Sequence, residues 1–445
     1  MGGRGTFYKD GIPINILNKL FNFTKEETTL KKEFIAGLTA FFAVVYIIAV
    51  NSSILSEAGV PREAAVLATI LASSLGSILV GLYSNAPLIM IPGMGVNALF
   101  SYTVVGSMGL SWNSALGTVI MGGIIFSIVA FTPLWRLLME AIPPSLNRAL
   151  TTGIGLFLTI LGLQKSGIVV SGNGSFGILG DLSSLEVQAA ILILIIALVL
   201  FIKNVPGNFL ITIIAGTVIS LILGINNFDF NKDFSFSLGG YKELFFNFSF
   251  EDILTPPFWV ASISFALVLI FSNLGVINAY VGEMLKVPGK FPRSFKANAI
   301  SALTCGFLGT SPTVTAAETA AGIAVGGKTG FTSIVTAALF LISIPLTPFI
   351  SIIPDIAVAP IFIIIGFLML QTIVNIDFTN INEGIPAFLT IVLIPFTSDI
   401  VNGMSFGFIA YPLLKLISGR GKEVKPTLYV IALLFVLNFV FSSVF

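Results

Sequence analysis

Fifteen apolar windows follow one another along this chain and occupy most of its length. Hydrophobic residues make up 56% of the sequence and charged residues only 10%, whereas a soluble domain carries about 25% charged residues. Most windows approach the roughly 20 residues that an α-helix needs to cross a bilayer. The chain is therefore predicted to be an all-α polytopic membrane protein embedded in a lipid bilayer. The windows lie at 34–51, 62–83, 87–104, 113–134, 145–165, 186–203, 207–225, 257–282, 295–309, 312–326, 329–352, 357–374, 383–399, 402–418 and 426–443.

The polar residues form no catalytic or metal-binding pattern. The chain has no histidine, and its one cysteine, Cys305, cannot form an internal disulfide. No nucleophile–base pair or cluster of metal ligands stands out. The stretch GTSPTVTAAET (309–319) lacks the Gly-Lys-Ser/Thr ending of a phosphate-binding loop. A net charge of +1 provides no bulk attraction to nucleic acid. We therefore expect a protein that is not an enzyme, uses no cofactor or metal and binds no nucleic acid.

Lysine and arginine gather in alternate loops. Six of them lie in the polar segment 1–33, and others recur in every second loop, as in Lys286 to Lys296. The opposite loops hold few, among them Arg62 and Lys165. Because basic loops remain on the cytoplasmic side, we predict a multi-pass protein of the cell (plasma or inner) membrane with a cytoplasmic N-terminus. With fourteen spans, Lys415 to Lys425 also fall on that side.

A long polar interval, 226–256, separates two sets of seven windows. Because seven is odd, two successive halves must cross the membrane in opposite directions, which is the inverted-repeat plan of secondary transporters. Weak internal similarity agrees, since GIGLFLTILGLQ (153–164) and IIIGFLMLQ (363–371) lie in the fifth and twelfth windows. The expected organisation is a cytoplasmic segment 1–33, a first repeat 34–225, an extracytoplasmic connector 226–256, a second repeat 257–418 and an extra hydrophobic segment 419–445. Whether 426–443 spans the membrane or packs near the cytoplasmic face is left open.

The third window of each half is interrupted, by IPGMGVNALF (91–100) and by SPTVTAAETAAG (311–322). In the second half, Pro312 and the β-branched residues after it disfavour a helix. The 13 or 14 residues that remain for a helix rise only about 20 Å, which is short of a ~30 Å hydrocarbon core. We therefore predict a short strand followed by a half-helix. Such backbone is tolerated at this depth only where it lines an enclosed cavity, and interruptions at paired positions indicate the binding site of a transporter.

Glu318 lies in the second interruption and is the central candidate residue, grouped with its neighbours Thr315 and Thr319. A carboxylate at this depth is a functional candidate by default. Burial and hydrogen bonds act on its pKa in opposite directions, so it is suited to titrate. It could accept N–H groups of a ligand, carry a coupling proton, or do both. The alternative is a structural carboxyl group bonded to a backbone carbonyl.

The first interruption contributes Gly95 and Asn97. Glycine allows the backbone to approach a ligand, and the free amides at a half-helix start provide donors and positive potential. The alternative is a Pro/Gly kink, with Asn97 bonding a neighbouring helix. Ser272 and Asn273 in the eighth window are polar groups in an apolar helix, which either face the site or join helices together. Tyr46 in the first window is a weaker candidate, and Asp399, in a tight connector, is expected to be solvated.

Five stretches in order resemble the adenine/guanine/hypoxanthine permease branch of the nucleobase:cation symporter family, within the nucleobase–ascorbate transporter superfamily. They are KKEFIAGLTAFFAVVYIIAVN (31–51), PGMGVNALFSYTVV (92–105), LTTGIGLFLTILGLQKSGIVV (150–170), ETAAGIAVGGKTG (318–330) and EGIPAFLTIVLIPFT (383–397).

This resemblance implies a 7+7 inverted-repeat fold with core spans 1–4 and 8–11, gate spans 5–7 and 12–14, and short strands in the third and tenth spans. It also implies uptake of a purine-like nucleobase, coupled to protons, by an elevator-like movement of core against gate. Glu318 matches the tenth-span glutamate of the family and Asn97 its third-span asparagine. A homodimer is also expected.

Two stretches depart from the branch. Ser272 stands where the eighth span usually has an acidic residue that bonds the base or shares proton coupling. Ala316 and Ala317 replace a usual Tyr-Val or Tyr-Ile pair, which predicts a roomier pocket. The base and the coupling ion are therefore left open. The alternatives are an anion transporter of the related sulfate-transporter-like fold and a transport-inactive membrane sensor.

Overall fold

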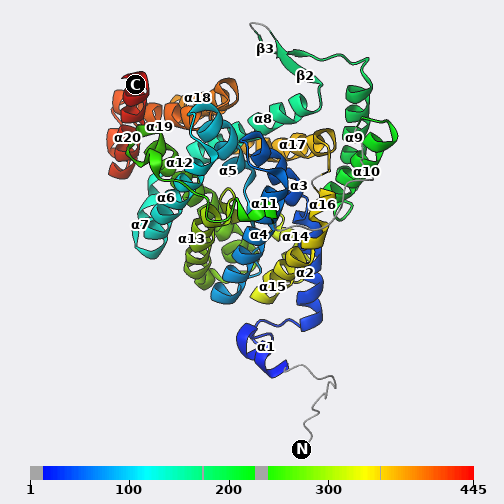
Figure 1. Ribbon diagram of the computed structural model, residues 1–445. Coiled ribbons are helices and arrows are strands. Elements are labelled where there is room, and N and C mark those ends of the chain that lie inside the picture. The colour runs from blue at the N-terminus through cyan, green and yellow to red at the C-terminus, as the bar shows by residue number, and fades with distance from the viewer. Residues whose placement is uncertain (1–13, 173–174, 226–238, 351, 445) are drawn as a thin grey trace, which may run out of the picture.

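The computed structural model describes residues 14–172, 175–225, 239–350 and 352–444. These residues form a bundle of packed helices with a few short strands (Figure 1). The basic residues predicted at Arg4 and Lys9, and much of the connector 226–256, lie outside the described residues. Residues 239–256 of that connector hold α11 (Gly239–Lys242) and the 3₁₀ turn η2 (Glu251–Leu254).

The first seven spans follow the predicted windows in order. Short elements accompany them: α1 (Ile14–Phe21) precedes the first span, α7 (Leu134–Ala141) follows the fourth, and the hairpin β2 (Val169–Gly172) and β3 (Ser175–Leu179) follows the fifth. The spans are α2 (Leu30–Val44) with α3 (Ile47–Glu57), α4 (Arg62–Ser84), β1 (Met90–Pro92) with α5 (Met94–Ala98) and the π-helix η1 (Leu99–Ser107), α6 (Trp112–Phe131), α8 (Pro144–Lys165), α9 (Leu185–Ile202) and α10 (Asn208–Ile222).

The second seven spans repeat this plan, with a broken third member. They are α12 (Pro256–Ile277) with the π-helix η3 (Asn278–Met284), α13 (Phe291–Leu308) after the turn η4 (Pro288–Lys290), β4 (Thr313–Thr315) with α14 (Thr319–Ala324), α15 (Gly330–Ile342) with η5 (Ile344–Leu346) and α16 (Thr347–Ile350), α17 (Asp355–Leu370) with η6 (Gln371–Asn375), α18 (Ile381–Thr397) and α19 (Ile400–Ile417). The chain continues through η7 (Gly421–Glu423) into α20 (Pro426–Val444).

Helix length and composition support a count of fourteen spans. Within the described residues, 9 helices are long and apolar enough to cross a membrane. The shorter apolar helices include α10 and α18, and α13 and the two broken spans complete the fourteen. Helix α20 packs against α19, α12 and α7, and its relation to the bilayer stays open.

The spans pack in two groups. In the first, α6 packs on α12 and α13, α4 packs on α13 and α15, and α2 packs on α15 and α14. In the second, α8 packs on α17 and α18, α17 packs on α9 and α10, and α18 packs on α19. These groups correspond to the predicted core and gate spans. The residue boundaries of the two repeats stay a prediction.

The two broken spans meet, as predicted. Strands β1 and β4 pair in antiparallel fashion, with Ile91 opposite Val314 at the centre of the register. The N–H of Ala316 donates to the carbonyl of Ile89 at 2.8 Å, which extends the ladder by one bond. Each strand leads into a half-helix, α5 or α14, and both strands are largely buried. Hydrogen-bonded strands satisfy the backbone groups that a broken span leaves open at this depth.

The prediction that Asp399 is solvated is wrong. Its side chain is buried, and its Oδ1 accepts hydrogen bonds from the N–H groups of Val401 at 2.8 Å and Asn402 at 3.0 Å. Asp399 is therefore the N-cap of α19. A connector this short keeps its residues within the packed bundle, so its carboxylate is used by the helix that follows.

Candidate functional site

Glu318 is held by a tyrosine from the first span. It lies at the turn between β4 and α14, and the hydroxyl of Tyr46 donates to its Oε1 at 2.5 Å. Tyr46 sits at the junction of α2 and α3 and is buried. Its ring packs edge to face on Phe209 of α10, with 4.9 Å between centroids. A carboxylate of the core thus contacts, through one tyrosine, a helix of the gate group. Glu318 itself is only partly buried.

A second tyrosine reaches the same turn. The hydroxyl of Tyr280 donates to the carbonyl oxygen of Ala317 at 2.6 Å. Tyr280 belongs to η3, where the eighth span changes from α-helical to π-helical hydrogen bonding. Such π segments are frequent at functional sites. Sequence alone gives no reason to select Tyr280, because one aromatic residue in an apolar span carries no signal of its own.

The middle of the eighth span has an open face. A Cβ atom built on Gly275 meets nothing within 4 Å, and Gly275 is exposed. Ser272 precedes it by three residues, so the two share a face of α12. Ser272 is partly buried, and its hydroxyl makes no hydrogen bond within the described residues.

Asn273 and Thr315 are brought together in a buried network. Nδ2 of Asn298 in α13 donates to Oδ1 of Asn273 at 2.7 Å and to Oγ1 of Thr315 at 3.0 Å. The N–H of Thr315 donates to the same Asn273 oxygen at 3.0 Å. All three side chains are buried. The network joins α12 and α13 to β4, which is the helix-joining role that the sequence left open for Asn273.

Asn97 and Thr319 are also turned inward. The hydroxyl of Ser311 donates to Oδ1 of Asn97 at 2.6 Å, while Nδ2 of Asn97 has no partner among the described residues. Oγ1 of Thr319 accepts from the N–H of Ile89 at 3.2 Å. Both contacts connect one broken span to the other. Gly95 lies at the boundary with the gate, because a Cβ there would be 3.1 Å from Ile154 Cδ1 of α8.

The structure thus sorts the predicted site residues into two layers. Tyr46 and Glu318 form a contact that borders accessible space, and Ser272 lies on the open face of α12. Asn97, Asn273, Thr315 and Thr319 lie behind them, in the hydrogen bonds that hold the strand crossing. Contact of any of these residues with a substrate stays a prediction. Sequence reasoning missed Tyr280 and Asn298.

The fold and the strand crossing define a class of protein. Two groups of helices and a pair of interrupted spans that meet around a carboxylate are the features of a polytopic membrane transporter with a core and a gate. The comparisons agree at the level of the family. Residues 31–442 match the model of the xanthine/uracil permease family, which is described as "Permease family". The chain belongs to this family, whose members are transporters.

Curated relatives are 30% to 40% identical to this chain over their aligned residues. A nucleobase transporter of Paenibacillus larvae is 40% identical over 92% of this chain and 85% of its own length. A guanine/hypoxanthine permease of Bacillus subtilis is 36% identical, covering 94% of this chain and 98% of the relative. An adenine permease of Escherichia coli is 33% identical, covering 96% of both chains.

Solved structures share the fold at low sequence identity. The transmembrane domain of the cyanobacterial bicarbonate transporter BicA superposes with a TM-score of 0.63 at 16% identity, covering 84% of this chain and 97% of that domain. A murine solute carrier 26 anion transporter in its inward-facing state gives 0.64 at 12% identity, covering 93% of this chain and 74% of that one. At these identities the likeness is one of fold alone.

Proposed function

We propose that this protein is a secondary active transporter that imports a purine-like nucleobase across the cell membrane. The observation that carries the proposal is the position of Glu318 at the crossing of the two broken spans, held by Tyr46 and bordering accessible space. The activities named for the relatives, which cover nearly the whole chain, give the substrate class.

A purine suits the groups that converge here. Burying a planar polar base costs several kcal/mol unless its edges find hydrogen-bond partners. Glu318 offers carboxylate oxygens to ring N–H groups, and the backbone at the start of α5 offers amide donors to ring nitrogens or carbonyl oxygens. Ser272 and the open face at Gly275 bound the space on the α12 side. We place the base between the crossing and this face of α12.

We further propose that Glu318 carries a coupling proton and that the core moves against the gate. In the described residues, Glu318 is the one acidic side chain at the crossing. Because Ser272 supplies no second carboxylate, we assign both proton binding and base binding to Glu318. The same proposal puts the N-terminus in the cytoplasm, which the distribution of basic loops supports. A homodimer is part of the same proposal.

A competition uptake panel tests the substrate. Purified protein in proteoliposomes takes up a labelled purine with and without an inward proton gradient, against unlabelled adenine, guanine, hypoxanthine, xanthine and uracil. Competition by purines and stimulation by the gradient are expected. Anion transport is the second candidate, because the two structural neighbours named above carry that description. Uptake stimulated by an anion and indifferent to purines would replace the proposal with that candidate.

Replacing Tyr46 by Phe is expected to lower the initial rate of uptake about 3- to 10-fold. The change removes the donor to Glu318 and keeps the ring that packs on Phe209. A hydrogen bond to a charged group contributes about 1.5–3 kcal/mol, part of which water replaces at a partly open site. The measurement is uptake as a function of external pH, since a Glu318 without its donor should also shift the pH profile. An unchanged rate and profile would show that Tyr46 only fills space.

A further inference from the structure

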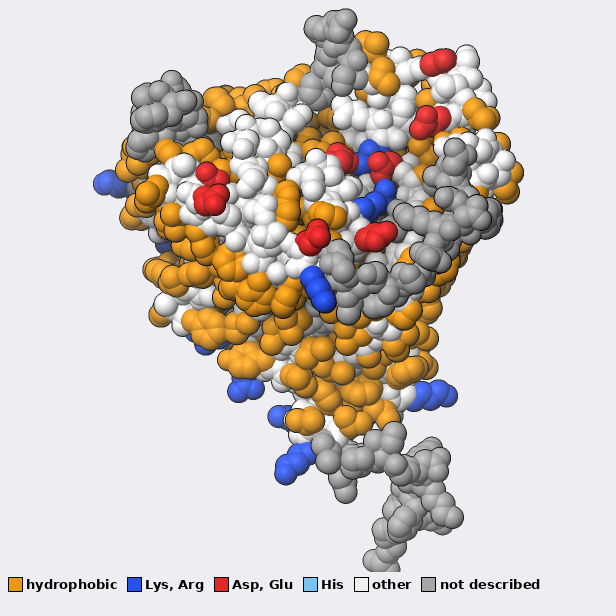
Figure 2. Space-filling model, in the orientation of Figure 1, with side chains coloured by type: hydrophobic (Ala, Val, Ile, Leu, Met, Phe, Trp, Pro, Cys, Tyr) orange, Lys and Arg blue, Asp and Glu red, His pale blue; other side chains and the backbone are white. Residues whose placement is uncertain are grey.

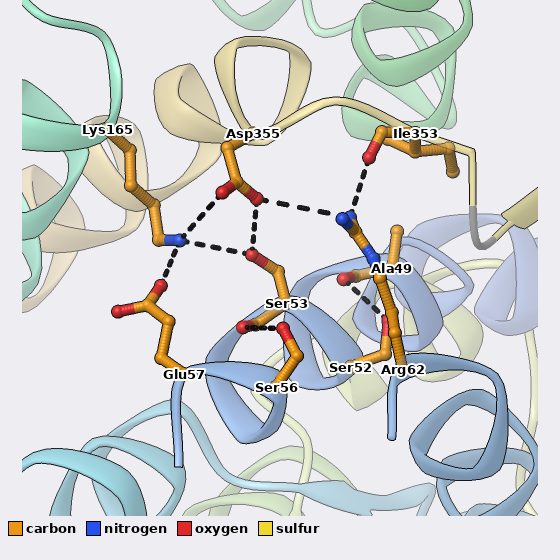
Figure 3. A network of polar contacts seen from close by, with 9 residues as sticks. All are labelled: Ala49, Ser52, Ser53, Ser56, Glu57, Arg62, Lys165, Ile353 and Asp355. Carbon is orange, nitrogen blue, oxygen red and sulfur yellow. Dashed lines mark hydrogen bonds and ion pairs between the residues drawn. The ribbon is translucent and has the colours of Figure 1, made fainter. Parts of the chain in front are cut away.

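Four charged side chains bridge the core and the gate at the end of the molecule remote from α1. Figure 2 shows acidic and basic side chains gathered on one part of a largely apolar and neutral face, near α3 and α17. Figure 3 shows how they meet. Glu57 ends α3 and Arg62 begins α4, both in the core group, whereas Lys165 ends α8 and Asp355 begins α17, both in the gate group.

Most contacts of the charged side chains in this network cross between the two groups. Lys165 forms an ion pair with Glu57. The hydroxyl of Ser53, also in α3, donates to Oδ1 of Asp355 at 2.7 Å and accepts from Nζ of Lys165 at 3.1 Å. Arg62 donates to the carbonyl of Ile353 at 2.6 Å, and its guanidinium is 3.9 Å from Oδ1 of Asp355.

The charges are arranged so that the core and gate groups can separate without leaving Lys165 unpaired. Each group contributes one cation and one anion, and each pairs with the opposite charge of the other group. The side chain of Lys165 is 9% exposed, against 39% for Glu57. A cation this deeply packed is costly to leave without a partner. Inside the gate group, however, Asp355 also lies 3.5 Å from Lys165. When core and gate part, Lys165 loses Glu57 and keeps Asp355.

We propose that Ser53, Glu57, Arg62, Lys165 and Asp355 form an outer latch, a reversible ionic lock that keeps the extracytoplasmic side closed while the site faces the cytoplasm. The inference rests on the proposed transport by movement of core against gate. Partly exposed ion pairs are weak enough to break within a transport cycle. A permanent contact between core and gate would need a partner for Lys165 only in the closed state. A reversible lock also needs one in the open state, and Asp355 provides it.

Cysteine labelling tests the latch without any substrate. Cys305, the one cysteine of the chain, is buried and is replaced by Ser. A probe cysteine is placed at Leu161, which is buried one helical turn before Lys165 on the same face of α8. Purified protein in lipid nanodiscs is treated with a charged maleimide. Glu57→Gln removes the ion pair with Lys165 and so destabilises the closed state relative to the open one. The labelling rate is expected to rise about 5- to 20-fold, which corresponds to a typical coupling free energy between two sites.

Three further variants make the result specific. Arg62→Gln removes the second pair between the groups without touching Lys165, and a smaller increase is expected. Lys165→Gln combined with Glu57→Gln should label no faster than the more strongly affected single variant, because both remove one interaction. Glu26→Gln is the matched control. It breaks an ion pair of 2.9 Å with Lys290, a partly buried pair that lies on the core side near the opposite end, and it should leave the rate unchanged.

The proposal is overturned if Glu57→Gln and Arg62→Gln both fold, with melting temperatures near that of the parent, and both label within twofold of it. It is also overturned if Glu26→Gln raises labelling as much as they do, since the increase would then report general loosening. Should Glu57→Gln fail to fold, Arg62→Gln decides alone. Labelling requires no transported base, so a failed latch leaves the purine proposal standing, and a failed uptake panel leaves the labelling interpretable.

Discussion

Replacing Glu318 by Gln is expected to abolish concentrative uptake while leaving the protein folded. Gln keeps the shape of the side chain and an oxygen that can accept from Tyr46, but it has no charge and cannot bind or release a proton. Proton-driven uptake in proteoliposomes should fall at least about 100-fold, because the buried N–H groups of the base lose their charged hydrogen-bond acceptor. The melting temperature should stay within about 3 °C of the parent, because a neutral amide at a partly buried position costs little.

Counterflow separates the three roles that Glu318 could have. If exchange of base for base persists without a gradient while concentrative uptake is lost, Glu318 acts as the proton carrier. If exchange is lost as well, Glu318 binds the base, alone or together with the proton. Glu283→Gln is the matched control, because Glu283 is an exposed acid in η3, and its uptake should stay at the parent level. Undiminished proton-driven uptake by the Glu318→Gln variant would refute both roles.

The fourteen spans were predictable because each corresponds to one apolar window of the sequence. A helix that crosses the bilayer forms all its backbone hydrogen bonds internally and exposes apolar side chains to lipid. It therefore appears in the sequence as an apolar window of about the length of the crossing. The two breaks were visible for the same reason, since Pro312 and the Pro92–Gly95 stretch interrupt otherwise apolar windows. That the two breaks meet was expected of a transporter's binding site, whereas the sequence did not show that their strands pair with each other, with Ile91 opposite Val314.

The direction in which a polar side chain points was not predictable. In an apolar span, an asparagine that faces a ligand and one that joins helices give the same pattern. Asn273 proved to bond Asn298 and Thr315, and Asn298 had not been selected at all. Asp399 had been read as a loop residue because the sequence does not show how closely two helices approach.

The outer latch illustrates the same limit for charged residues. Arg62 and Lys165 lie at span ends, where the sequence supports only their use in assigning orientation. Their partners Glu57 and Asp355 are distant from each other in the chain and adjacent in the fold. A pairing of this kind depends on which helix ends meet, and that depends on the packing of core against gate.

Gly93→Ala is expected to push strands β1 and β4 apart and to reduce the rate of uptake about 10- to 100-fold. A Cβ atom on Gly93 would lie 2.6 Å from Cγ2 of Val314 and 2.9 Å from Cγ2 of Val96. Valine is stiff at χ1 and cannot turn away, so the strands must shift. Overpacking of this kind costs about 1–3 kcal/mol of folding free energy. Because Glu318 lies only three residues after the end of β4, a shift of this strand also displaces the carboxylate from Tyr46.

A compensating substitution makes the cause of that loss testable. Val314→Ala removes the two γ-carbons of Val314 and leaves the 2.9 Å contact with Cγ2 of Val96. Because the shorter contact is gone, Gly93→Ala combined with Val314→Ala should recover at least about half of the parent uptake rate, in the manner expected of contacting residues. Val314→Ala alone opens a small cavity and should cost about 1 kcal/mol of stability with uptake largely kept. If the double variant is as inactive as Gly93→Ala, the clash with Val314 is not the cause. The remaining contact with Cγ2 of Val96, or the approach of the backbone to the substrate, would then account for the requirement for Gly93.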